Sequence, residues 1–313
     1  MFAVERIDDT NVDIFLPLIP RVLQEWGSDE SGWRFYGIVM DSTASGIIAL
    51  SESADICKLR YLYLLSECRG LGIIEKALSA ILFELYEQGF SRLTADYIPS
   101  EYPTIDSLLK SLSFTIQPTD RAYFRFQVKD VLRCKASTYA PQGVMRFKLL
   151  PEYQKETMYR MIRSHGYDID QILGSDVGEI GRLSFMEYSL VYMERDNPVG
   201  ILMVQDMSEA KLPEGGTAFG KIYPEPSSAT IALIYIGSTQ MKAPLYLLSA
   251  LCRNVLTNFQ DNEILTGYFP LGHLAKLLEG ALGVRGNHEV SAVINLSGLE
   301  QYYLEGNDDL NVL

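Results

Sequence analysis

The feature of this sequence that most restricts its fold is that the two halves predict the same order of helices and strands. In the first half, apolar residues alternate at strand spacing or recur at helical spacing, and short polar or Gly-containing turns separate the segments. The pattern predicts strands at 2–7, 34–41, 45–52, 56–64, 93–98 and 122–128, and helices at 12–26, 73–88 and 104–112. The resulting order is β-α-β-β-β-α-β-α-β, which excludes an all-helical or all-strand fold.

The second half gives this order again after an interruption by Pro and Gly at 135–143. It predicts strands at 144–150, 186–194, 199–207, 229–236, 263–269 and 289–296, and helices at 152–165, 243–259 and 271–282. A chain of 313 residues is also long enough for two domains of about 150 residues each. We therefore predict an α/β (α+β) fold with two similar domains, residues 1–134 and 144–313. Each domain is expected to have a mixed, mostly antiparallel sheet flanked by helices.

Charge and composition narrow the possible partners. The formal net charge of −13 repels nucleic-acid phosphates, and no basic patch offsets it, so we expect no nucleic-acid partner. The 4 cysteines show no CxxC spacing and the 3 histidines no HExxH pattern, so no metal site is predicted. The sequence also lacks a signal-peptide pattern and an apolar run long enough for a membrane helix. We expect a cytoplasmic protein that does not bind membranes.

The segment most informative about chemistry is a strand, a tight turn and a helix in direct succession at 59–85. The first N–H groups of a helix have no partner within it, and the helix dipole leaves partial positive charge there, so this position favours an anion such as phosphate. Gly70 and Gly72 lack Cβ atoms where a backbone would approach that anion, and Arg69 could add a charged contact. An ordinary glycine turn remains the alternative for an isolated RGLG.

The passage LYLLSECRGLGIIEKAL (62–78) resembles the signature of the GNAT acyltransferases, in which a strand is followed by a turn of the form Q/R-x-x-G-x-G/A and a helix. The element order of residues 2–128 is also that of the family, whereas for the C-terminal half the resemblance rests on element order alone. The resemblance implies a tandem GNAT fold that uses acetyl-coenzyme A as co-substrate. It places the pantetheine arm beside Leu64 and Leu65, and the pyrophosphate at Arg69, Gly70, Leu71, Gly72, Ile73 and Ile74.

Three departures from the family pattern bear on function. Glu67 stands where the family prefers Gln or Arg, and places a negative charge near the expected phosphate. Leu109 occupies the position where many members carry a tyrosine that protonates the leaving thiolate. The C-terminal copy has no Gly-x-Gly turn at 237–248 and has Glu279 at its tyrosine position, so we predict that it is degenerate.

Acyl transfer to an amine needs a base and a proton donor near the thioester, and the two central strands supply the candidates. Tyr61 and Tyr97 are candidate acids and Asp96 is a candidate base, although aromatic residues on a sheet are more often packing residues. Strict alternation along 56–64 predicts one face with Lys58, Arg60, Leu62 and Leu64, and another with Cys57, Leu59, Tyr61 and Tyr63. A Cys57 nucleophile is disfavoured because the N-terminal half contains no histidine to activate it.

Two functions follow as hypotheses. The first is an N-acyltransferase, most simply an acetyltransferase, acting on an amine of a small molecule or peptide. The second is a non-catalytic protein that binds acyl-coenzyme A or serves as a scaffold. The long segment 208–228 is either a lid or substrate loop or an ordinary surface loop. We expect a monomer or a homodimer.

Overall fold

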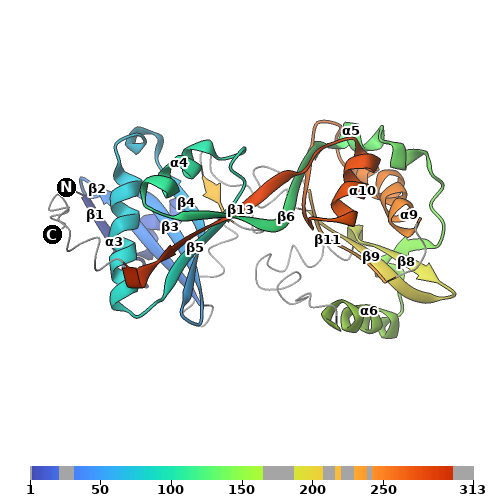
Figure 1. The fold of residues 1–313 in the computed structure, drawn as a ribbon, viewed down its shortest axis with the longest axis horizontal. Coiled ribbons are helices and arrows are strands. Elements are labelled where there is room, and N and C mark those ends of the chain that lie inside the picture. Colours follow the sequence, from blue (N-terminus) through green and yellow to red (C-terminus); the bar gives the residue numbers. More distant parts are fainter. Residues whose placement is uncertain are drawn as a thin grey trace. The chain divides into compact units, whose positions relative to one another are not determined.

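A computed structural model describes residues 2–20, 32–164, 187–206, 216–219, 229–237 and 242–298 (Figure 1). The chain forms two compact units. Unit 1 comprises residues 1–119, 212–225 and 289–313, and unit 2 comprises residues 120–211 and 226–288. Each unit contains a mixed sheet with helices packed on it, so the predicted fold class is confirmed.

Unit 1 is built on a sheet with the strand order β1-β2-β3-β4-β5-β13-β6. Its strands are β1 (Phe2–Arg6), β2 (Trp33–Met40), β3 (Thr43–Ser53), β4 (Ile56–Leu64), β5 (Arg92–Tyr97), β13 (Asn287–Asn295) and the first residues of β6 (Thr115–Gln127). Neighbours from β1 to β4 are antiparallel, β4 and β5 are parallel, and β5 and β13 are antiparallel. Within the described residues of unit 1, the α-helices are α1 (Val12–Phe15), α3 (Ile73–Glu87) and α4 (Pro103–Ser111).

The two faces of this sheet are covered by different helices. Apolar residues of α3 recur at helical spacing, and those that are buried pack on one face: Ile73, Ala77, Leu78, Ile81, Leu82 and Leu85. On the other face Phe15 of α1 is fully buried and lies directly over Gly37, where a Cβ atom would come within 2.1 Å of the Phe15 ring. Gly37 therefore lets α1 approach the sheet closely.

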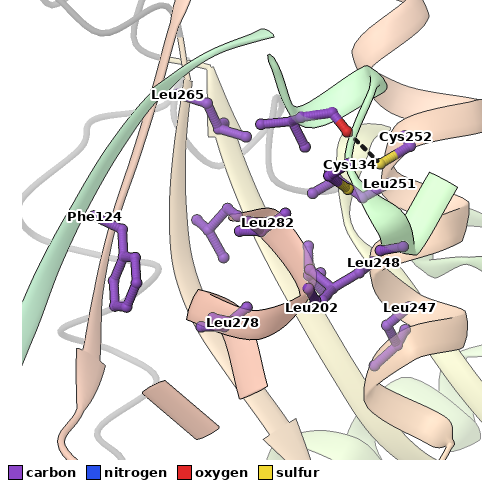
Figure 2. Close-up of a cluster of buried hydrophobic side chains, with 14 of the residues drawn as sticks. Phe124, Cys134, Leu202, Leu247, Leu248, Leu251, Cys252, Leu265, Leu278 and Leu282 are labelled. Atoms are coloured by element: carbon purple, nitrogen blue, oxygen red, sulfur yellow. Dashed lines mark hydrogen bonds between the residues drawn. The ribbon is translucent and has the colours of Figure 1, made fainter. Parts of the chain in front are cut away.

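Unit 2 repeats this architecture with the strand order β6-β12-β11-β9-β8-β7. Its elements are β7 (Val144–Arg146), α6 (Glu152–Ser164), β8 (Leu190–Glu194), β9 (Asn197–Asp206), β11 (Ala229–Ile236), α9 (Ala243–Ala250), β12 (Ile264–Pro270) and α10 (His273–Leu282), with α5 (Val128–Leu132) after β6. Figure 2 shows its core, in which Leu247, Leu248 and Leu251 of the α9 region face Leu278 and Leu282 of α10. The Cys252 thiol donates to the carbonyl oxygen of Val131 at 3.5 Å in this core.

The duplication extends to an irregularity in the central strand of each unit. In unit 1, β4 pairs with β5 over three residues and contains an extra residue, Arg60, relative to β3. In unit 2, β11 pairs in parallel with β12 over three residues and contains an extra residue, Ala232, relative to β9. The same bulge beside the same short parallel pairing supports the predicted internal repeat.

Strands β6 and β13 link the two units by exchange. β13 follows the last helix of unit 2, yet it pairs with β5 of unit 1 from Val290–Tyr97 to Asn295–Arg92. β6 begins in unit 1, where Thr119 Oγ1 donates to Glu289 Oε2 at 2.9 Å, and it continues as the partner of β12 in unit 2. The predicted domains 1–134 and 144–313 are each one continuous stretch of sequence. The compact units are instead defined by contacts and combine segments from both halves of the sequence.

Several predicted elements are shorter than expected. The helix expected at 12–26 consists of α1 and a 3-10 turn at Leu16–Leu18, and its remainder from 21 onward lies outside the described residues. Pro20 favours an extended conformation at Ile19, which has ψ 119° and ends the turn. The strand expected at 144–150 ends at Arg146 and continues as a 3-10 turn.

β6 begins at Thr115, earlier than the predicted 122. The described helices include none that is long and apolar enough to cross a membrane. A cluster of three or more potential metal ligands is likewise not found among the described residues.

Candidate functional site

The candidate site lies where β4 and β5 stop pairing. Their parallel register runs from Ile56–Arg92 to Lys58–Thr94, and Arg60 then forms the bulge in β4. A bulge bends a strand and increases its local twist. Past Lys58, β4 therefore has an edge that β5 does not cover in the described part of the chain.

Hydrogen bonds identify the backbone groups on this edge. The N–H of Leu65 donates to Ser45 O of β3 at 2.8 Å, so the odd-numbered residues after the bulge point their backbone groups toward β3. The backbone N–H and C=O groups of Arg60, Leu62 and Leu64 point away from β3. We call the backbone N–H and C=O groups of these three residues the inner edge of β4.

Because of the bulge, the side chains of β4 lie on different faces from those predicted. Cys57 and Leu59 lie in the core beneath α3, as do Leu62 and Leu64, whereas strict alternation placed these two pairs on opposite faces. The prediction was wrong because Arg60 is an extra residue relative to β3. Every later side chain of β4 therefore lies on the face opposite to the one that strict alternation predicts. Tyr61, opposite Ala49 in the register, consequently lies on the face away from α3.

The turn after β4 contains both glycines of the predicted anion site. Gly70 and Gly72 have φ values of 75° and 68°, a left-handed conformation that favours glycine, and the space where their Cβ atoms would lie is open. Gly72 is the N-cap of α3 and, being a glycine, has no side chain that could cap the helix start. The first backbone bond of the helix runs from Lys76 N to Gly72 O, so the N–H groups of Ile73 and Ile74 have no helical acceptor.

The charged side chains of the turn do not cap those N–H groups. Arg69 Nε donates to Leu64 O on the inner edge at 2.9 Å. The Glu67 carboxylate accepts a hydrogen bond from Ser66 Oγ at 3.1 Å, and Glu67 itself is exposed. Arg69 thus ties the turn to the end of β4, and the helix start stays uncovered by Glu67. Of the other residues predicted for the cofactor, Leu71 is exposed, Ile73 is buried in the core, and Leu65 and Ile74 are half-buried.

A short strand from the second half of the sequence occupies part of the inner edge. β10 (Thr217–Ala218) pairs antiparallel with β4, with Thr217 opposite Leu62 and Ala218 opposite Tyr61. The N–H of Phe219 donates to Arg60 O at 2.9 Å. For residues 208–228 the sequence predicts a lid or substrate loop, or an ordinary surface loop. It gave no sign of a strand here, because a pairing this short carries no periodicity.

The three candidate catalytic residues lie on two faces of the sheet. The Tyr97 side chain lies in the core with α3 and donates its hydroxyl to Asp106 Oδ1 of α4 at 2.8 Å. Burial, and then this hydrogen bond, raise the pKa of Tyr97. Asp96, the next residue back along β5, points to the opposite face and is half-buried.

Tyr61 differs from Tyr97 in having a hydroxyl that is not already engaged. Its side chain is fully buried, and the hydroxyl has no hydrogen-bond partner among the described residues. Burial, with a further contribution from Tyr63, raises its pKa, so the phenol keeps its proton at neutral pH. Tyr61 and Asp96 share the face away from α3, on the two strands that separate beyond Lys58.

Other residues considered in the sequence have structural partners. Cys57 is fully buried and burial raises its pKa to about 11, which agrees with the argument against a nucleophilic thiol. Leu109 is fully buried in the core, so no polar group replaces the tyrosine expected there. Glu279 Oε1 of the second copy accepts from the N–H of Gly286 at 3.2 Å. The turn of this copy falls partly on residues 238–241, outside the described residues.

Comparison with solved structures identifies the fold. A tandem GNAT protein from the clavulanic acid biosynthesis pathway superposes with a TM-score of 0.60 at 11% identity, over 95% of this chain and 99% of that one. A GCN5-related N-acetyltransferase from Sphaerobacter thermophilus gives a TM-score of 0.57 at 12% identity, over 94% and 96% of the two chains. No protein-family model and no curated protein sequence matches the chain. At these identities the likeness is one of fold, and the chain has the tandem GNAT fold that the sequence predicted.

Proposed function

We propose that this protein is an N-acyltransferase, most simply an acetyltransferase, that transfers the acyl group of acyl-coenzyme A to an amine of a small molecule or peptide. The observation that carries the proposal is the uncapped start of α3, reached through two left-handed glycines at the point where β4 leaves β5. This arrangement suits a diphosphate, because the N–H groups without an acceptor in the helix and the helix dipole both favour an anion. The Sphaerobacter protein of the same fold is an N-acetyltransferase, which favours acetyl transfer as the chemistry.

In this proposal the pyrophosphate of coenzyme A lies against the backbone from Arg69 to Ile74. The pantetheine arm adds to the inner edge of β4 near Leu64 and Leu65. The Glu67 carboxylate keeps its negative charge, but it accepts the Ser66 hydroxyl and does not occupy the start of α3. The thioester would then lie near the bulge, because the arm runs back along β4 from the turn.

The chemical step joins the amine nitrogen to the thioester carbonyl carbon and breaks the carbon–sulfur bond. Asp96 is the proposed acceptor of the proton that the amine loses. Tyr61 is the proposed partner of the departing sulfur. With its pKa raised by burial, Tyr61 is suited to donating a hydrogen bond to the thiolate while keeping most of its proton. Tyr97 is left out of this scheme because its hydroxyl is bonded to Asp106 on the other face.

The first test compares the same substitution at the two ends of α3. Gly72 and Gly89 both have left-handed φ values, 68° and 83°, and neither has an atom within 4 Å of an added Cβ. Gly72→Asp places a carboxylate about 5 Å from the proposed diphosphate, a repulsion of about 3 kcal/mol at an effective dielectric constant of about 20, or about a hundredfold in affinity. Titration calorimetry with acetyl-coenzyme A should show this loss, whereas Gly89→Asp should bind like the parent protein. Equal affinities for the two variants would contradict the proposed phosphate site.

The second test concerns Tyr61. Because its buried hydroxyl has no hydrogen-bond partner in the part of the chain that the structure describes, Tyr61→Phe should change the free energy of unfolding by no more than about 1 kcal/mol. If the hydroxyl assists the departing sulfur, kcat for thiol release should fall about a hundredfold with KM for acetyl-coenzyme A unchanged. An unchanged kcat would remove Tyr61 from the mechanism.

A second candidate function is a non-catalytic protein that binds acyl-coenzyme A or acts as a scaffold. Two observations favour it: a buried leucine stands at the position of the usual tyrosine, and β10 already pairs with the inner edge. Binding of acetyl-coenzyme A without thiol release across a panel of amines would support this function over the transferase.

A further inference from the structure

The strand β10 lies on the edge that the proposed cofactor needs. The inner edge offers backbone groups from three residues, Arg60, Leu62 and Leu64. Arg60 O accepts from the N–H of Phe219 at 2.9 Å, Leu62 lies opposite Thr217 in the antiparallel register, and Leu64 O accepts from Arg69 Nε at 2.9 Å. Each of the three residues therefore already faces a group of the chain itself.

Side-chain burial shows that β10 is anchored to unit 1. Phe219 is 1% exposed and belongs to the core cluster that contains Leu62 and Leu64 of β4 and the buried face of α3. Thr217 is also buried. An aromatic side chain buried to this extent contributes substantially to holding a short segment in place. The core beneath α3 is thus completed by a residue that lies in sequence between β9 and β11 of unit 2.

The pantetheine arm and β10 make the same kind of contact. Pantetheine contains two amide groups in a linear chain, and it would pair with β4 as an added strand does. Two amides need two successive residues of the inner edge, and beyond β10 this edge offers Leu64 alone. An N–H or C=O group of a strand edge cannot pair fully with two added strands at once.

We propose that β10 is an internal competitor strand: it pairs with the inner edge of β4 in the free protein and must leave Arg60 and Leu62 before acyl-coenzyme A binds. This inference rests on the proposed function, because it concerns the pantetheine site of that function. The apparent dissociation constant is then the intrinsic one divided by the fraction of molecules in which the edge is free. Weakening β10 raises this fraction and tightens binding.

A pair of proline variants tests the competition. The N–H of Phe219 points to β4, and so does that of Thr217 two residues earlier, whereas the N–H of Ala218 points away. Thr217→Pro removes a donor of the β10–β4 ladder, and Ala218→Pro is the matched control that adds the same ring and keeps the donors. Phe219→Ala weakens the anchor by a different route.

Two ligands separate the edge from the turn. Acetyl-coenzyme A uses both, whereas 3′-phosphoadenosine 5′-diphosphate carries the phosphates without the arm and uses the turn alone. We expect Thr217→Pro and Phe219→Ala to bind acetyl-coenzyme A at least tenfold more tightly than the parent protein, and Ala218→Pro within twofold of it. The affinity for the nucleotide should stay within twofold in all variants, with thermal melting showing that each is folded.

A measurement on the parent protein needs no variant. Hydrogen exchange should show the Phe219 amide protected in the free protein, and saturating acetyl-coenzyme A should increase its exchange at least tenfold, since the ligand releases β10.

Each other outcome has a definite meaning. Equal affinity of all variants for acetyl-coenzyme A, or increased protection of Phe219 on binding, would overturn the competition and leave the proposed function intact. Weaker binding by Thr217→Pro would show that β10 supports the site. Parallel changes for both ligands would also overturn the competition, because the effect would then not be confined to the edge of β4. If neither ligand binds any form, the proposed function fails and this inference fails with it.

Discussion

Leu296 offers a test of the strand exchange between the two halves of the sequence. It follows β13 near the C-terminal end of the described chain, yet it is fully buried in the core of unit 1, and its N–H donates to Ser91 O at 2.9 Å. We predict that Leu296→Ala destabilises unit 1, which is otherwise built mainly from the N-terminal residues 1–119. A chain whose halves each closed their own sheet would transmit the change to unit 2 instead.

The size of the effect follows from burial. Removing three carbon atoms from a fully buried leucine costs the transfer free energy plus that of the cavity, about 3 kcal/mol if the site lies in the lower half of the measured range. This corresponds to about a hundredfold increase in the equilibrium constant for opening the affected unit. Hydrogen exchange detected by mass spectrometry resolves such a change peptide by peptide. Peptides from β4, α3 and β5 should lose about two orders of magnitude of protection, while peptides from β9 and β12 keep theirs.

Leu278→Ala is the matched control. Leu278 is also fully buried, but it lies in α10 within the core of unit 2, so the same chemical change should reduce protection of β9 and β12 and spare β4 and β5. The reasoning would be refuted if Leu296→Ala reduced protection in β9 and β12 while leaving β5 unchanged.

Two further substitutions test the packing and hydrogen bonds around the site. Tyr97→Phe removes the hydrogen bond to Asp106 and should cost about 1 kcal/mol of unfolding free energy in urea at pH 7, with turnover unchanged. Hydrogen bonds from Lys110 and then Tyr97 hold the pKa of Asp106 below its ordinary value. The stabilisation by ionised Asp106 is therefore complete above its unfolded pKa of about 4, and it is lost as pH falls through the lowered pKa of the folded protein. The cost of Tyr97→Phe should consequently shrink at low pH. A cost that stays constant with pH would contradict this prediction. Gly37→Ala would place a Cβ 2.1 Å from Cζ of Phe15 and should lower the free energy of unfolding by about 1–3 kcal/mol. Thermal melting measures this loss. The double variant with Phe15→Leu should recover part of it, because the clash is then smaller.

Elements with a strong local pattern were predicted closely. The strand at 56–64 is β4 with the same bounds, and the helix at 73–88 is α3, one residue shorter. In a long amphipathic segment the buried side is apolar, so the spacing of its apolar residues indicates the type of element from the sequence alone. The helix predicted at 12–26 is interrupted by Ile19, because Pro17 and Pro20 disfavour a continuous helix there despite the helical spacing of apolar residues.

The candidate site was predicted in part for the same reason. Gly70 and Gly72 could be located from the sequence, because a left-handed turn before a helix has a local signature. The facing of the β4 side chains could not, because the bulge at Arg60 exists only relative to the register of β3. The engagement of Tyr97 with Asp106 likewise depends on how α4 packs on β5.

The sequence by itself determined the order of elements, their duplication and the glycine turn at the start of α3. Only the tertiary structure decided that β13 completes the sheet of unit 1 and that β10 pairs with the inner edge of β4. The physical reason is that apolar periodicity and turn chemistry act between neighbours in the chain. A strand edge instead accepts whichever distant segment can reach it, satisfy its hydrogen bonds and bury its side chains.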